Sequence, residues 1–171
     1  MTDERLGDGL WTALERLPRG AGVVVRHYSL PSAVRRTLFE AVRRVARRRG
    51  LVLLLAGSPR EAVAWRADGA HGRSPHRAAT RPLIRTAPAH DRADWIQAQR
   101  AGCDLIFVSP LFATRSHPGA VPLGHVRAGL LIGAGRDRAV LLGGMTRARF
   151  RALRAMGFGR WAAIDAWGAV N

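Results

Sequence analysis

The chain has 171 residues, and 47% of them are hydrophobic, so we predict a single globular domain over residues 1–171. No run of about 18 apolar residues is present, so we expect neither a transmembrane helix nor a membrane partner. The first residues are charged and lack the apolar stretch of a secretory signal. Because the single cysteine, Cys103, cannot form an internal disulfide, we predict a cytoplasmic protein.

The formal net charge is +16, and arginine supplies all of the positive side chains because the sequence contains no lysine. A field of this sign attracts nucleic acids, acidic membrane surfaces and small anions. The arginines are spread along the chain, and exposed aromatic residues are not interleaved with them. We therefore interpret most of them as solvated helix faces and do not expect a nucleic-acid partner.

The first half of the chain alternates buried strands with amphipathic helices. Residues 22–26 are typical of a buried strand, and residues 32–49 place apolar side chains at helical spacing: Val34, Leu38, Ala41, Val42 and Val45. Ser32 is a candidate N-cap and Gly50 a C-terminal stop. We then expect a strand at 51–55, a helix at 60–66, a short strand at 67–72 and a strand at 83–87.

The second half continues the same alternation. We expect, in chain order, a helix at 91–101, a strand at 104–109, a long loop at 110–122, a helix at 123–132, a strand at 139–142, a helix at 146–156 and a strand at 160–164. Continuous apolar strands that alternate with helices predict a parallel sheet covered by helices. A closed barrel and an open doubly wound sheet share this pattern. The long loop after one strand and Gly143-Gly144 after the next favour a barrel with its site at the carboxyl ends of the strands.

Four segments resemble the thiamine phosphate synthases and their thiazole-tautomerase relatives. They are VVVRHY at 23–28, ADGAHG at 67–72, AGCDLIFVSPLFATRSHPG at 101–119 and LLGGM at 141–145. They occur in the family's order. The resemblance implies an α/β fold of the TIM (β/α)8 barrel type. It also implies a site where hydroxymethylpyrimidine diphosphate meets a thiazole phosphate.

The resemblance also bears on the first strand of the barrel. Met1-Thr2-Asp3 matches only the end of the family's first strand, and residues 10–17 match its first helix. Most of the first strand is therefore expected to be absent from this chain. Since a barrel without one strand has two unpaired edges, we expect either that the natural start lies upstream or that the sequence is an incomplete fragment.

Three candidate binding residues follow the early strands. Arg26 ends a buried strand and matches the arginine that the family uses to hold diphosphate. Tyr28 stands where the family has a phosphate-binding lysine, and it could bind ligand or simply pack at the strand end. His71 ends the ADGAH strand, where a ligand role and a structural role are both open.

Later in the chain, Gly143 and Gly144 lie between a strand and a helix, where backbone amides could approach a phosphate. In the family, the long loop supplies hydroxyl groups and a lysine to the diphosphate. The residues at those places here are Thr114, Arg115, Ser116 and His117. We expect the anion-binding groups, Arg26 and the Gly143-Gly144 turn, to face one cavity mouth.

The family also implies magnesium, which two aspartates bind together with the diphosphate. Those positions fall in Ala56-Gly57-Ser58 and in Gly72-Arg73-Ser74-Pro75, and neither contains an acid. No metal ligand is therefore assigned, and the cofactor stays unknown. Ser109-Pro110 is closer to the synthase motif than to the tautomerase one, which disfavours tautomerase chemistry.

Two functions remain open at this point. The resemblance implies a transferase of thiamine biosynthesis that joins the two phosphorylated heterocycles and releases pyrophosphate. The missing acids favour the alternative, a barrel that has lost catalysis and binds thiamine phosphate or a related phosphorylated heterocycle as a regulatory or accessory protein. The sequence does not decide between them, nor does it give the oligomeric state.

Overall fold

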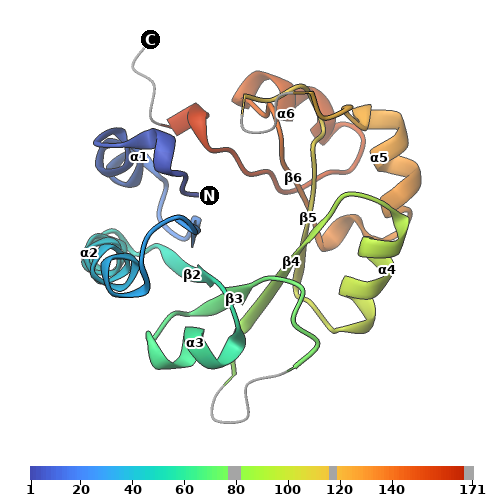
Figure 1. Cartoon of the computed structure of the whole chain (residues 1–171). Helices are drawn as coiled ribbons and strands as arrows, with labels where there is room; N and C mark the ends of the chain where they lie inside the picture. Colours follow the sequence, from blue (N-terminus) through green and yellow to red (C-terminus); the bar gives the residue numbers. More distant parts are fainter. Residues whose placement is uncertain (77–81, 116–118, 168–171) are drawn as a thin grey trace. The chain divides into compact units, whose positions relative to one another are not determined.

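A computed structural model describes residues 1–76, 82–115 and 119–167 of the chain, and Figure 1 shows its course. By their internal contacts the residues form two compact units. The described residues of the first unit are 1–71, 82–84 and 164–167, and those of the second are 72–76, 85–115 and 119–163. The prediction of a single domain stays a prediction.

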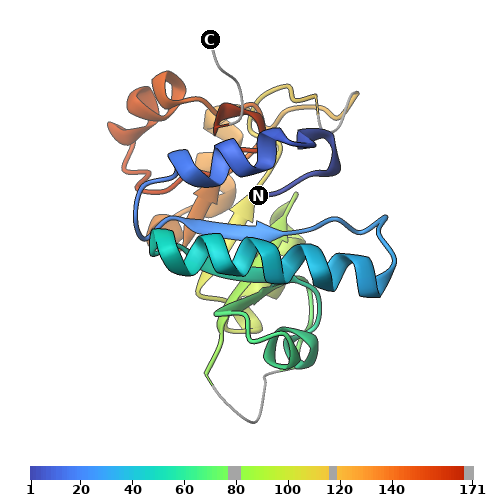
Figure 2. The ribbon, with the colours of Figure 1, turned by 90° about the vertical axis from the view of Figure 1, so that its left-hand side faces the viewer.

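The first unit contains a parallel three-stranded sheet with helices beside it. Strand β1 (Gly22–Val25) pairs with β2 (Val52–Ala56), and β2 pairs with β3 (Gly69–His71). The unit's helices are α1 (Gly9–Arg16), α2 (Ser32–Arg49), α3 (Pro59–Ala64) and two short 3₁₀ turns, Glu4–Leu6 and Asp165–Trp167. Figure 2 shows α1 and the long α2 on either side of β1.

Helix α2 has the predicted bounds, and most of its expected apolar face lies at the core, whereas Val34 does not. Gly50 ends the helix in the left-handed conformation, as predicted. The buried residues are Arg35, Phe39, Val42 and Ala46, whereas Val34 is 51% exposed. The expected N-cap is also wrong by one residue, because Ser32 is the first helical residue and Pro31 precedes it.

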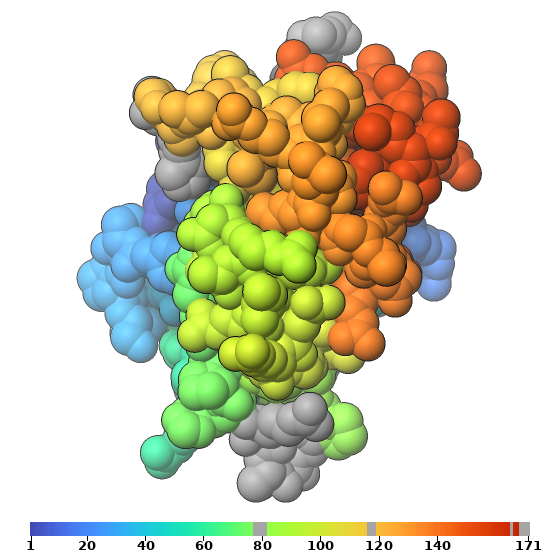
Figure 3. Space-filling view, turned by 90° about the vertical axis from the view of Figure 1, so that its right-hand side faces the viewer, coloured from blue at the N-terminus to red at the C-terminus, as the bar shows by residue number. Residues whose placement is uncertain are grey.

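The second unit repeats the arrangement with its own core. Strand β4 (Ile84–Ala89) pairs with β5 (Leu105–Val108), and β5 with β6 (Ala139–Leu141), all in parallel. The helices are α4 (Arg92–Arg100), α5 (Gly124–Ile132), α6 (Arg147–Arg154) and the 3₁₀ turn Gly135–Asp137. Figure 3 shows α4 and α5 next to each other on the surface of this unit.

The α/β class and the parallel pairing are confirmed, and the described residues contain six strands. A complete eight-stranded barrel is not among them. The strand expected at 160–164 is present only as a parallel bridge between Trp161 and Leu141. At the start of the chain, the Thr2 amide donates to the Val24 carbonyl at 2.9 Å, so this residue lies beside β1. None of the described helices combines the length and apolar character needed to cross a membrane.

Candidate functional site

The carboxyl end of β1 in the first unit carries two of the predicted residues, Arg26 and Tyr28. Between them, His27 has a left-handed backbone, with φ of 39°, and a buried side chain. The Arg26 amide donates to the Thr2 hydroxyl oxygen at 3.0 Å, and the same hydroxyl forms a hydrogen bond with Nδ1 of His27, also at 3.0 Å. Burial of the His27 ring lowers its pKa.

Arg26 is partly enclosed and lies near an acid. Its side chain is 23% exposed, and its Nη1 is 3.9 Å from a carboxylate oxygen of Asp3. Arg5 binds the same carboxylate more closely, with Nε 2.7 Å from Oδ1. Burial acts to raise the pKa of Asp3, but the hydrogen bonds and charge of Arg5, together with the charge of Arg26, outweigh it and lower that pKa. Because its contact with Asp3 is long, Arg26 keeps N–H donors for a ligand.

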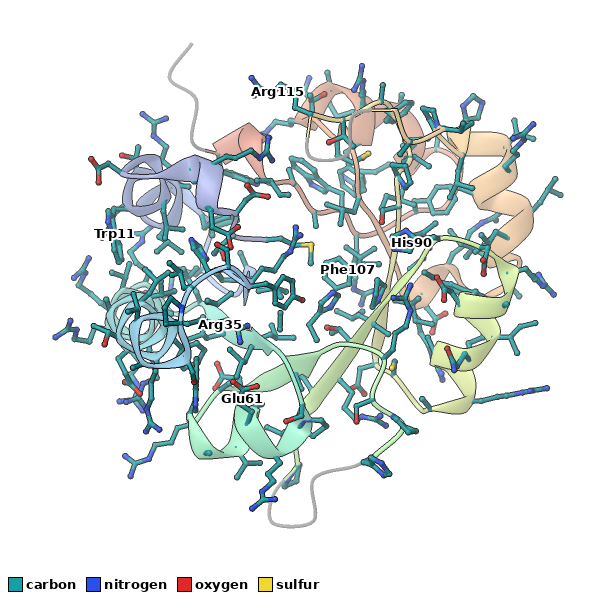
Figure 4. All side chains as sticks on the ribbon, in the orientation of Figure 1. Trp11, Arg35, Glu61, His90, Phe107 and Arg115 are labelled. Carbon is teal, nitrogen blue, oxygen red and sulfur yellow. The ribbon has the colours of Figure 1, made fainter. Side chains whose placement is uncertain are left out.

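The sequence did not predict the role of Arg35. This arginine is 9% exposed, and its guanidinium donates to the carbonyls of Arg26, at 2.7 Å, and of Ala56. It therefore joins the carboxyl ends of β1 and β2. Its Nη1 is also 3.6 Å from Glu61 of α3, and Figure 4 labels both residues. The signal in the sequence was the spacing of Arg35, Phe39, Val42 and Ala46, which share one helical face.

His71 lies at the end of β3, as predicted, and is 5% exposed. Its carbonyl accepts a hydrogen bond from the Gly57 amide at 3.1 Å. Gly57 follows β2, so this bond joins the carboxyl ends of β2 and β3 within the first unit. A ligand role for the buried His71 ring stays a prediction.

In the second unit, the Gly143-Gly144 turn lies between β6 and α6, as predicted, with φ of 97° and 59°. It packs closely against the start of the long loop. The Leu111 amide donates to the Leu142 carbonyl at 2.8 Å, and the Phe112 amide to the Gly143 carbonyl at 3.1 Å. A Cβ atom on Gly143 would lie 2.8 Å from Cα of Pro110, and one on Gly144 would overlap the Ala113 carbonyl oxygen. Both glycines are therefore required by packing as well as by φ.

The first turn of α6 follows this glycine turn directly. Thr146 is the N-cap, and its hydroxyl oxygen accepts the Arg149 amide at 3.2 Å. The Arg149 guanidinium donates to the Gly144 carbonyl and lies 4.6 Å from the centre of the Phe112 ring. The N-terminal amides of a helix attract anions, so the segment from Gly143 to Thr146 has the chemistry of a phosphate site.

The long loop after β5 brings two more candidates into the second unit. Thr114 is half-buried and Arg115 is exposed, and both follow the Pro110–Ala113 segment that packs on the glycine turn. Figure 4 labels Arg115. Ser116 and His117 lie outside the described residues. The structure thus brings the glycine turn and the base of the loop together. Arg26, Tyr28 and His71 lie in the other unit, so a shared cavity mouth stays a prediction.

The residues at the family's two metal positions do not fit a magnesium ion. A Cβ atom at Gly57 would lie 2.5 Å from Oε2 of Glu61, and this carboxylate already faces Arg35. At the other position, Arg73 brings a positive charge. Within the described ranges, no three side chains of the His, Cys, Asp and Glu types gather as a metal site would require. No step of a reaction is therefore assigned to magnesium.

Arg73 is instead tied to α4 of the second unit. Its Nε and Nη2 donate to the two carboxylate oxygens of Asp94, at 3.2 and 2.8 Å. The hydrogen bond from Arg73 lowers the pKa of Asp94, and the His90 amide donates to the same carboxylate at 3.0 Å. The His90 ring, labelled in Figure 4, donates from Nδ1 to the Ser109 carbonyl at 2.8 Å.

Comparison with solved structures shows the same fold in two related proteins. A thiamine phosphate pyrophosphorylase from Pyrococcus furiosus matches with a TM-score of 0.75 and 19% identity, over 98% of this chain and 85% of that one. A thiamine phosphate pyrophosphorylase from Bacteroides thetaiotaomicron matches with a TM-score of 0.63 and 17% identity, over 96% and 80%. No curated protein matches the chain significantly.

The family model described as thiamine monophosphate synthase matches residues 2–167, which is nearly the whole sequence. This match spans both units and includes all four segments on which the resemblance was based. The chain therefore belongs to the thiamine monophosphate synthase family.

Proposed function

We propose that this protein binds the phosphorylated heterocycles of thiamine phosphate synthesis, with a phosphate held at the Gly143-Gly144 turn. The observation that carries the proposal is the geometry of this turn. Two glycines in left-handed conformations lead into the capped first turn of α6, and the base of the long loop packs against them. Backbone amides and a helix dipole favour an anion there.

The first candidate activity is the family reaction. In it, the C–O bond to the pyrimidine methylene breaks, pyrophosphate leaves, and the thiazole nitrogen attacks that methylene. Arg26 supplies a guanidinium for diphosphate in the first unit, and Thr114 and Arg115 supply a hydroxyl and a guanidinium in the second. Guanidinium groups pair well with phosphate oxygens, and they retain their charge at neutral pH.

The second candidate is binding of thiamine phosphate without turnover. The residues at the family's two metal positions favour binding without turnover, because Gly57 and Arg73 provide no carboxylate. A departing pyrophosphate needs its developing charge neutralised. The family's two aspartates are not at those positions, and the Glu61 carboxylate beside Gly57 faces Arg35 instead. Anion binding itself does not require these aspartates.

Two measurements on the purified protein separate these candidates. Calorimetry with thiamine phosphate measures binding, and a coupling assay with hydroxymethylpyrimidine diphosphate and thiazole phosphate measures turnover, each with and without magnesium. Binding with turnover supports the synthase, and binding without turnover supports the second candidate. If thiamine phosphate and both substrates fail to bind, the proposal is wrong.

A pair of charge variants tests the position of the diphosphate. Arg115→Gln should weaken binding of hydroxymethylpyrimidine diphosphate about ten-fold or more, because charge-assisted hydrogen bonds to phosphate are the strong ones. Arg127→Gln removes the same charge from an exposed position on α5 of the same unit and should leave binding unchanged. Equal losses of affinity in both variants would show that only the overall positive charge matters, and would contradict a ligand contact at Arg115.

A further inference from the structure

Tyr28 is unusual among the aromatic residues because its ring lies open to solvent. Its side chain is 61% exposed, while every other aromatic side chain that the structure describes is buried or half-buried. It follows the carboxyl end of β1, the edge at which enzymes with parallel strands bind their ligands. An exposed ring at this edge is a candidate contact for a ligand.

The turn that carries Tyr28 is anchored on both sides. On the N-terminal side, His27 is held in a left-handed conformation and bonded to Thr2. On the C-terminal side, the amide and hydroxyl of Ser29 both donate to Oε1 of Glu4, at 3.3 and 3.0 Å. Tyr28 is therefore presented by a fixed turn, which limits the entropy lost when a ligand binds.

Two guanidinium groups lie near the ring of Tyr28. The Cζ atom of Arg35 is 5.4 Å from the ring centre and that of Arg26 is 5.8 Å from it, both within the range of a cation–π contact. Arg35 is buried and bonded to backbone carbonyls, so it gives the ring a fixed support. These contacts explain where the ring lies, but they leave most of its surface uncovered.

We propose that Tyr28 is a stacking platform for an electron-poor nitrogen heteroaromatic ring that carries a phosphate or diphosphate, and that Arg26 binds the phosphate. This inference rests on the proposed function and deepens it, because it assigns the heterocycle end of the ligand. The electron-rich face of a tyrosine ring attracts an electron-poor ring in an offset stack. Arg26 lies within 5.8 Å of that ring and is partly exposed, so one ligand can reach both groups.

The test compares an aromatic probe with a non-aromatic one. Hydroxymethylpyrimidine phosphate and inorganic pyrophosphate are titrated by calorimetry against wild type, Tyr28→Phe and Tyr28→Leu. Tyr28→Phe keeps the ring and should bind the pyrimidine probe within about two-fold of wild type. Tyr28→Leu keeps an apolar side chain without a π face and should lose about ten-fold, as expected for the loss of one stacked ring. Pyrophosphate should bind all three proteins equally.

Val34→Ala is the matched control, because Val34 is an exposed apolar residue on α2 of the same unit and should not affect either probe. If Tyr28→Leu binds the pyrimidine probe as wild type does, there is no platform. If Tyr28→Leu weakens both probes equally, Tyr28 acts by positioning Arg26 and the stacking proposal is wrong. Failure of the wild type to bind the pyrimidine probe overturns it as well.

The outcomes for this inference and for the proposed function are separable. If thiamine phosphate binds while Tyr28→Leu binds the pyrimidine probe as wild type does, only the platform is rejected. If thiamine phosphate and thiazole phosphate do not bind but the pyrimidine probe binds and depends on Tyr28, the platform is supported and the phosphate position at the Gly143-Gly144 turn is rejected.

Discussion

Three residues at the carboxyl ends of the strands have left-handed backbones: His27, Gly143 and Gly144. For a glycine this conformation carries no steric cost, whereas a histidine there is uncommon and is held by its surroundings. His27 is fixed by its hydrogen bond to Thr2 and by burial. The two glycines are fixed by the close approach of Pro110–Ala113. The candidate binding turns are therefore specified by local conformation as well as by charge.

The free energy of unfolding of a Gly144 variant measures how strongly the fold requires glycine at this position. Gly144→Ala should destabilise the protein by about 1–3 kcal/mol, since a Cβ atom would overlap the Ala113 carbonyl at a positive φ. In α5, a methyl group on Gly129 would meet open space, so Gly129→Ala should stabilise by about 0.5–1 kcal/mol. Urea unfolding measures both, and equal stability of Gly144→Ala and wild type would contradict the packing argument.

Burial of His27 predicts a specific dependence of stability on pH. Because burial lowers its pKa, the unfolded chain binds a proton at this residue more readily than the folded one. The buried, neutral His27 therefore contributes its full stability above the unfolded pKa of about 6.5. This stability is lost as pH falls from 6.5 through the lower pKa of the folded state. His27→Asn, which tolerates the left-handed backbone, should flatten this part of the curve. Urea unfolding at several pH values tests it, and identical slopes in the two proteins would exclude His27 as the cause.

At the scale of elements, α2 shows how one buried guanidinium connects neighbouring strands. Arg35 lies on the face that packs against the core, and its N–H groups bond to the carbonyls at the carboxyl ends of β1 and β2. Carbonyls at strand ends lose their partners in the ladder, and a buried one without a hydrogen bond is costly. Arg35 therefore acts as a structural donor and positions Tyr28.

Removing this donor should cost more than removing an exposed arginine of the same helix. Arg35→Met should destabilise the protein by about 1–3 kcal/mol, because buried carbonyls lose a donor and Glu61 loses its guanidinium. Arg44→Met, at an exposed position of α2, should stay within about 0.5 kcal/mol of wild type. Thermal and urea unfolding measure the difference. Similar effects of the two changes would show that the Arg35 bonds contribute little.

The sequence predicted the elements better than it predicted their contacts. Helix α2 begins and ends at the predicted residues because its apolar spacing and Gly50 are local signals. Val34 was wrongly taken as part of the core, and the burial of Arg35 was not predicted because its hydrogen bonds are tertiary. The strand expected at 160–164 reduces to one bridge, since pairing depends on the neighbour β6 as well as on apolar residues.

The candidate site was likewise predictable only where its features are local in the sequence. The glycine turn and its helix were predictable, because glycine between a strand and a helix is a local signal of a close approach. The ion pair of Arg35 with Glu61 and that of Arg73 with Asp94 were not, since each joins residues that are distant in the sequence. These pairs are also what makes the two metal positions unsuited to magnesium, so the structure adds most where charges from different elements meet.

At the scale of the whole molecule, each unit has a hydrophobic core of its own. One core is centred on residues such as Phe39 and Leu55, and the other on residues such as Trp95 and Ile106. Each unit also carries candidate anion-binding groups at the carboxyl ends of its strands. Both units therefore keep cationic groups near their binding turns, although most of the molecule's arginines lie elsewhere along the chain.

A net charge of +16 on 171 residues should destabilise the folded state through self-repulsion. Salt screens this repulsion over a Debye length of about 10 Å at 0.1 M. The melting temperature should therefore rise as sodium chloride increases from low concentration to physiological ionic strength. A variant with Arg44→Gln and Arg127→Gln, both at exposed positions in mid-helix, should melt higher at low salt and respond less to added salt. Differential scanning calorimetry measures both quantities. A melting temperature that falls with salt would mean that attractive ion pairs, such as Arg73 with Asp94, outweigh the repulsion between arginines.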